Sequence, residues 1–105
     1  MIENPELHPE AQAEYEAHLL YYARHQFSLT TLESFRAEIE DSFRQIATHP
    51  VAYRLVKKSG LQRRYGPTKK FRFVIYYVIK PDDQRPTILA IAHPSRNPDY
   101  WVRRV

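Results

Sequence analysis

The sequence contains no cysteine, no long hydrophobic run and no cluster of metal-ligating side chains. Without cysteine the chain can form no disulfide and has no thiolate nucleophile, which fits a reducing cytosol. No segment approaches the roughly 18 apolar residues of a membrane-spanning helix. The first residues, MIENPELHPEA, lack the charged-then-apolar order of a secretory signal. We therefore expect a cytoplasmic protein that does not act at a membrane.

The histidines are too scattered to indicate a metal site. They are His8, His18, His25, His49 and His93, and no cysteine is present to complete a zinc site with them. The sequence predicts no metal or other cofactor. At 105 residues the chain is long enough for a single core, so we expect one domain over residues 1–105.

Acidic and basic side chains are distributed unevenly, although the net charge is only +4. Residues 1–41 contain nine acidic side chains and two arginines, whereas residues 42–81 contain ten basic side chains and no acidic one. An acid-free stretch of this length favours an anionic partner for one face of the protein. The alternative is that the two halves simply neutralise each other in the folded domain.

Residues 71–80 alternate between two rows of side chains, which is typical of a β-strand. Residues 87–93 are almost wholly apolar, as expected for a strand covered on both faces. The prolines and aspartates of residues 81–86 predict the loop of a hairpin between them. Residues 61–65 predict a short strand, and residues 51–60 a basic connector. Residues 1–8 could form a short edge strand, although Pro5 argues against a regular one.

Two amphipathic helices precede these strands. The first begins at Pro9 and runs to about His25, since proline is favoured at a first helical position. The second ends near Thr48, and its apolar stripe is Leu32, Phe35, Ile39, Phe43 and Ile46. The short link between them predicts an antiparallel helical hairpin laid across the sheet. Helices followed by antiparallel strands define an α+β domain.

The order of these segments, together with several motifs, resembles the RelE/ParE family of toxins from bacterial toxin–antitoxin pairs. The resemblance begins at residues 8–11 (HPEA) and includes Tyr21-Tyr22, the stripe of the second helix and Arg63-Arg64. It is strongest in residues 71–77 (FRFVIYY) and residues 91–101 (IAHPSRNPDYW). The H-x-x-R-x-P-x-Y-W spacing of the last block is similar to the ParE, or plasmid stabilisation, side of the family.

The resemblance implies a helical hairpin packed on a small, twisted antiparallel sheet. It also implies a cognate antitoxin whose C-terminal segment wraps the toxin, against basic side chains or an exposed sheet edge. Two activities occur in the family. RelE-like members cut mRNA on the ribosome, and ParE-like members are associated with poisoning DNA gyrase, an action for which no catalytic residues are established.

Cleavage of RNA through its 2′-hydroxyl needs a base, an acid and cations near the developing charge. The weak candidates for such roles are His93, Arg96 and Tyr100. RelE-type nucleases carry a catalytic arginine at the position that Val74 occupies here, counted back from Tyr77. We expect Arg72, which is out of register with that position, to point to the opposite face. This departure argues against the nuclease, and we commit to no catalytic residue.

The basic side chains could instead contact DNA phosphates, with neighbouring aromatic rings adding stacking. Trp101 is either a lid on the core or an exposed anchor for a partner, and His93 either carries a proton or locks its turn by a hydrogen bond. A further alternative is a solvated basic face that binds only the antitoxin. The candidate target-binding or nucleic-acid-binding residues are Arg63, Arg64, Lys69, Lys70, Arg72, Arg96, Trp101 and Arg103.

We interpret the chain as a RelE/ParE-type toxin that inhibits DNA gyrase by binding and is neutralised by a cognate antitoxin. The alternative function is a ribosome-dependent mRNA endonuclease of the RelE type. A third possibility is an inactive member that retains binding alone.

Overall fold

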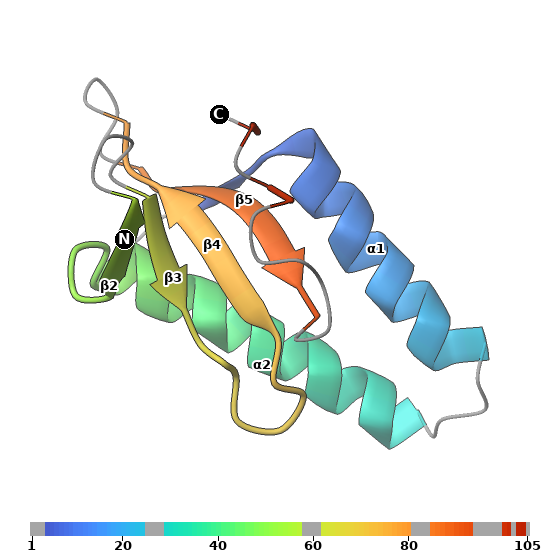
Figure 1. Ribbon diagram of the computed structural model, residues 1–105. Coiled ribbons are helices and arrows are strands. Elements are labelled where there is room, and N and C mark those ends of the chain that lie inside the picture. The colour runs from blue at the N-terminus through green and yellow to red at the C-terminus, as the bar shows by residue number, and fades with distance from the viewer. Residues whose placement is uncertain are drawn as a thin grey trace.

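Within the part of the chain that the structure describes, two helices pack against one face of a five-stranded sheet (Figure 1). The computed structural model describes residues 4–24, 29–57, 62–80, 85–93, 100–101 and 103–104. The elements in chain order are β1 (Glu6–Leu7), α1 (Pro9–Arg24), α2 (Leu29–Thr48), β2 (Arg54–Lys57), β3 (Gln62–Tyr65), β4 (Val74–Val78) and β5 (Thr87–Ala92). This arrangement confirms the α+β class.

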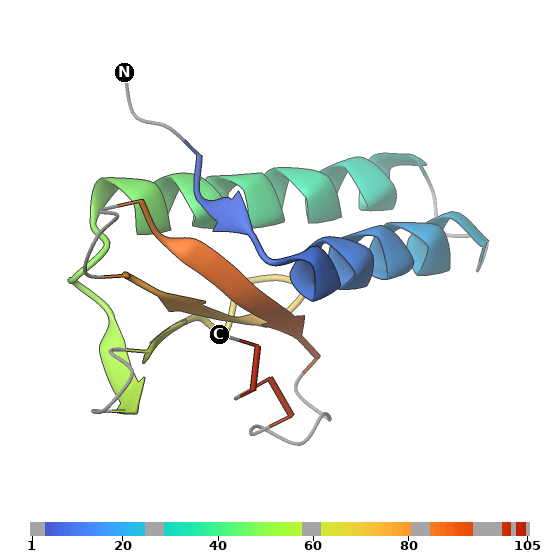
Figure 2. The same ribbon diagram turned by 90° about the horizontal axis from the view of Figure 1, so that it is seen from above.

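The helices agree closely with the sequence-based bounds. They lie side by side and run in opposite directions, as predicted for a helical hairpin (Figure 2). No described helix is long and apolar enough to cross a membrane. Residues 26–28 of the predicted link between the helices, residues 81–84 of the predicted hairpin loop over residues 81–86, and residues 94–99 of the H-x-x-R-x-P-x-Y-W motif lie outside the described residues.

The sheet has the strand order β1-β5-β4-β3-β2. Strands β2 to β5 pair in antiparallel fashion, as predicted, but β1 pairs with β5 in parallel. The expectation of a wholly antiparallel sheet is therefore wrong. Most of the chain separates β1 from β5, so no tight turn imposes an antiparallel pairing. Pro5 is compatible with β1 because it precedes the first donor, the Glu6 N–H, which bonds the Pro86 carbonyl at 2.9 Å.

Two strands differ from their predicted extents. Residues 54–57 form the edge strand β2, although residues 51–60 were expected to be a connector. The turn-forming residues at the end of that segment follow β2 and do not prevent its pairing with β3. In contrast, β4 begins at Val74 and not at residue 71. The backbone bends before it, where Arg72 has a φ of 63°.

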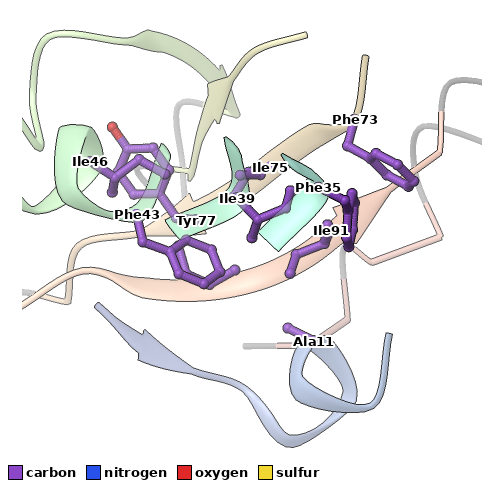
Figure 3. Packing of buried hydrophobic residues seen from close by; sticks show 10 residues of the cluster. Ala11, Phe35, Ile39, Phe43, Ile46, Phe73, Ile75, Tyr77 and Ile91 are labelled. Carbon is purple, nitrogen blue, oxygen red and sulfur yellow. The ribbon is translucent and has the colours of Figure 1, made fainter. Parts of the chain in front are cut away.

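The helix-facing side of the sheet is covered by the apolar stripe of α2. Phe35, Ile39 and Ile46 are fully buried, and Phe43 is nearly so. Figure 3 shows these side chains pointing toward Ile75, Tyr77 and Ile91 from β4 and β5. The spacing of the stripe is the helical one, so its prediction from sequence is confirmed apart from Leu32, which is only half-buried.

The other face of β4 and β5 is covered by the C-terminal tail. Trp101 has no exposed surface, and its indole stacks on the Tyr76 ring with centroids 4.3 Å apart. It packs with Val74, Leu89 and Ala90 in a second apolar cluster. Trp101 is therefore the lid on this face, and the alternative of an exposed anchor for a partner is wrong. The expectation that β5 is covered on both faces is confirmed.

Arg104 fastens this tail to α1 and β5. Its guanidinium lies 3.1 Å from a carboxylate oxygen of Glu10 and 3.0 Å from one of Glu14. It also donates to the Leu89 carbonyl at 3.1 Å and lies over the Tyr100 ring. Only 13% of the Arg104 side chain is exposed. Charge-assisted bonds with so little exposure hold the tail firmly beside Trp101.

Replacement of Arg104 by alanine should destabilise the protein by about 1–3 kcal/mol, because it leaves the poorly exposed Glu14 carboxylate without its cation. The measurement is urea-induced unfolding followed by tryptophan fluorescence, which reports Trp101 directly. The control is Arg103→Ala, since Arg103 is exposed and its loss should change the free energy of unfolding by less than about 0.5 kcal/mol. Equal effects of the two variants would show that the tail is not held by Arg104.

Candidate functional site

A basic groove lies on the face of the sheet that points away from α2. In Figure 1 this face of the sheet is turned toward the viewer. The volume of the groove is about 450 Å³. Strands β2 to β4, the loop before β4 and the end of β5 line it, through Arg54, Leu55, Val56, Arg64, Pro67, Arg72, Val74, Tyr76, Ala92 and His93. We call this site the basic groove.

The strand register aligns two of its arginines. Arg54 lies opposite Arg64 in the β2–β3 pair, and Arg64 lies opposite Tyr76 in the β3–β4 pair. Residues directly opposite each other in antiparallel strands project from the same face. The pairing therefore places Arg54, Arg64 and Tyr76 in one row across the sheet.

Arg72 reaches the groove from a fixed loop. The Thr68 N–H donates to the Phe73 carbonyl at 2.9 Å, and the Phe73 N–H donates to the Thr68 hydroxyl at 3.0 Å. The Glu38 carboxylate of α2 accepts the N–H groups of Lys70 at 2.8 Å and Phe71 at 2.9 Å. These bonds hold the loop against α2.

The fixed loop maintains Arg72 in a left-handed conformation, with φ of 63°. For a residue other than glycine this conformation costs about 1–2 kcal/mol. Gly66 also has a positive φ, but glycine adopts this conformation without that cost. It has φ of +104°, and an added Cβ would lie 2.8 Å from the Phe73 carbonyl oxygen. A strained arginine beside a groove is typical of a functional position.

The expectation that Arg72 points to the opposite face from Val74 is wrong. Both residues line the basic groove. They are two positions apart, which is the spacing of side chains on one face of a strand, and the bend at Arg72 does not carry its side chain away.

His93 follows β5 and lies at the rim of the groove. Its ring is exposed and meets the Phe73 ring edge-on at 5.7 Å. It also lines a small cavity of about 80 Å³ with Glu14, His18, Ile91 and Tyr100. Tyr100 is half-buried against Arg104 and does not line the basic groove.

Arg63 has a structural role that the sequence did not indicate. Its guanidinium donates to the carbonyls of Val51 at 3.2 Å and Tyr53 at 2.7 Å. Beside it, the Tyr77 hydroxyl donates to the Pro50 carbonyl at 2.6 Å. Burial raises the pKa of Tyr77 to about 12, so its hydroxyl keeps its proton well above neutral pH. Arg63 and Tyr77 thus fasten the segment between α2 and β2.

The other predicted residues are dispersed. Lys69 and Lys70 are exposed on the loop before β4 but do not line the groove, and Arg103 is exposed on the tail. Trp101 is buried and cannot contact a partner in this position. Arg96 lies outside the described residues. Of the predicted binding residues that are described, the groove brings together Arg64 and Arg72, with His93 beside them.

Sequence reasoning missed Arg54 as a site residue. The signal was present, because RLVK (residues 54–57) and QRRY (residues 62–65) are short segments that can pair through a hairpin. Recognition of the first as a strand would have placed Arg54 opposite Arg64. The turn residues after it favoured a connector instead.

The groove can bind anions. Three arginines line it, and none of its lining residues carries a carboxylate. Guanidinium groups bind phosphate through charge and paired hydrogen bonds. Within the described ranges, no three His, Asp or Glu side chains come close enough to hold a metal ion.

The two-helix layer, the twisted sheet and the basic face together are consistent with the RelE/ParE class of toxins. The family profile described as "ParE toxin of type II toxin-antitoxin system, parDE" matches residues 6–98. The chain therefore belongs to the ParE family and is a toxin of the type II toxin–antitoxin class, which implies a cognate antitoxin. Comparison with curated proteins found no match, and comparison with solved structures found none either.

The neighbouring residues Arg63 and Arg64 should respond differently to substitution. Arg63→Met should lower the free energy of unfolding by about 1–3 kcal/mol, because two backbone carbonyls lose a charged donor. Arg64→Met should lower it by less than about 0.5 kcal/mol, since Arg64 makes no hydrogen bond to another described residue. Urea unfolding of both variants tests this difference, and equal losses would contradict the assignment of Arg63 as the structural member.

Proposed function

We propose that the protein inhibits DNA gyrase by binding to it, without cleaving nucleic acid, and that its cognate antitoxin relieves the inhibition. The match to the ParE family over residues 6–98 carries this proposal. The basic groove supports it, because a complex of gyrase with DNA offers an anionic surface. The proposed action takes place in the cytoplasm, where the gyrase target is found.

The residue at position 74 also favours binding over cleavage. RelE-type nucleases have a catalytic arginine there, whereas this chain has Val74, whose side chain is buried in the floor of the groove. A hydrocarbon side chain can neither stabilise a developing charge nor transfer a proton. The groove cations would then position an anion and do no chemistry on it.

The purified toxin should reduce the supercoiling of relaxed plasmid by gyrase and ATP, and should leave cleaved DNA after detergent and protease treatment. The variant Arg44→Gln should inhibit as strongly as the original protein, because Arg44 lies on α2 and pairs with Asp41 on the helix layer. Prior mixing with the antitoxin should restore supercoiling. Undiminished supercoiling at micromolar toxin would rule out the proposal.

A ribosome-dependent mRNA endonuclease is the second candidate function. The observation that favours it is that His93 lines the same groove as three arginines, since an imidazole can serve as a general acid or base. Induction of the toxin in cells would then create new mRNA ends at ribosomal A-site positions, and His93→Ala would reduce them. An unchanged primer-extension profile after induction would remove this alternative.

The antitoxin is proposed to cover an apolar hollow on the helix layer. This hollow of about 350 Å³ is lined by Glu16, Leu19, Leu20, Ala23, Leu32 and Arg36 from both helices. Leu20 in this lining exposes about half of its surface, and Tyr21 and Leu29 on the same two helices expose half or more of theirs. An amphipathic helix is a suitable occupant, because its apolar stripe can enter such a hollow between two helices.

The substitution Leu20→Glu should weaken antitoxin binding at least tenfold, because it places a charge in the apolar hollow, and it should leave gyrase inhibition unchanged. Calorimetric titration with the antitoxin, together with the supercoiling assay, measures both effects. The control Ala17→Glu adds the same charge to an exposed position of α1 that does not line the hollow. Equal losses of affinity in the two variants would refute the placement of the antitoxin.

A further inference from the structure

The groove arginines differ from most of the other arginines in their surroundings. Arg36 and Arg44 pair with carboxylates on α2, Arg104 pairs with two on α1, and Arg85 donates to the Asn4 carbonyl. In contrast, Arg54, Arg64 and Arg72 make no ion pair or hydrogen bond to any other described residue. Their donors are thus available within the described part of the protein.

These donors lie beside hydrocarbon. Val74, Tyr76, Ala92 and the two aliphatic residues of β2 form the apolar part of the groove lining. Exclusion of water by such groups strengthens the attraction between a guanidinium and an anion. Arg64 is the arginine most shielded from water in this way, since its Nε atom is buried and has no hydrogen-bond partner in the described residues.

The strained backbone at Arg72 also indicates that the groove binds an anion. The loop is held to α2 through Glu38, and the result is a left-handed arginine at the groove and not the glycine or asparagine that such a backbone favours. Nothing in the helix-side core requires the Arg72 side chain, because it is exposed and lines only the groove. The strained position of Arg72 is therefore better explained by a binding role of its guanidinium than by packing.

We propose that Arg54, Arg64 and Arg72 bind the phosphodiester backbone of duplex DNA in the basic groove. This inference rests on the proposed gyrase function, since it assigns the groove to the DNA that gyrase holds. Each arginine contacts one phosphate, and the apolar lining lies against the sugar edge between them. Glu38 is the positioning residue that fixes the Arg72 loop.

The proposed number of three phosphate contacts determines how steeply the binding constant should fall with salt concentration. Each neutralised phosphate of duplex DNA adds a slope of roughly −0.9 to a plot of log binding constant against log salt concentration. The original protein should therefore show a slope of about −2.7, and the loss of one arginine should reduce it to about −1.8. At 50 mM salt the same loss weakens binding roughly tenfold.

The test is fluorescence anisotropy of a labelled 16-base-pair duplex, titrated with the full-length toxin between 50 and 200 mM salt. The variant is Arg72→Gly, which removes the cation and suits the left-handed backbone, so its melting temperature should not fall. Arg54→Ala is the second variant, because Arg54 is exposed on the edge strand. The matched control, Arg44→Gln, removes one positive charge from α2.

The proposal predicts a lower slope and a roughly tenfold weaker affinity for Arg72→Gly and for Arg54→Ala, with the original values for Arg44→Gln. Equal effects of all three variants would indicate a general charge effect and overturn it. Tighter binding to single-stranded RNA of the same length would overturn it as well. A supercoiling assay on the same variants distinguishes the proposal of DNA binding from the proposal of gyrase inhibition. Gyrase inhibition without DNA binding refutes only this inference, whereas DNA binding without gyrase inhibition refutes only the proposed function.

Discussion

The structure depends on the burial of β4 and β5 on both faces. The stripe of α2 covers one face, and Trp101 with the tail covers the other. Burial of one tryptophan of about 200 Å² stabilises a fold by roughly 5 kcal/mol, so the tail is a substantial part of the core. Every side chain of these two strands is buried and none is charged, so β4 and β5 contribute no cation to the surface. The cations of the groove come from β2, β3 and the loop before β4, where one face of the sheet remains open.

The same constraint explains why α2 influences the groove on the far side of the sheet. Its buried stripe fixes the helix against β4 and β5, and Glu38, on the same helix, can then hold the loop before β4 at 2.8 and 2.9 Å. The strain at Arg72 persists because these bonds and those of Thr68 determine the backbone. The position of an exposed arginine thus depends on the packing of the opposite layer.

Much of the fold was predictable because it follows from local patterns. The stripe of α2 has the period of a helix with one buried face, and the continuous apolar run of β5 is typical of a strand covered on both faces. The site was less predictable, because it depends on pairing between segments. Arg63 and Arg64 are adjacent and chemically identical, yet one fastens the connector and the other lines the groove. The strand register decides this, and neither charge nor composition reports it.

The positions of the apolar hollow and the basic groove limit how the proposed antitoxin could neutralise the toxin. The apolar hollow lies on the helix layer and the basic groove on the opposite face of the sheet, so a partner seated only in the hollow would leave the arginines open. An antitoxin that neutralises the toxin at the groove must therefore pass an edge of the sheet. The β2 edge adjoins the groove directly, because Arg54, Leu55 and Val56 lie both on that strand and in the groove lining. An extended segment paired with β2 would cover the groove by its own bulk, which makes antitoxin affinity and antitoxin neutralisation two separable properties.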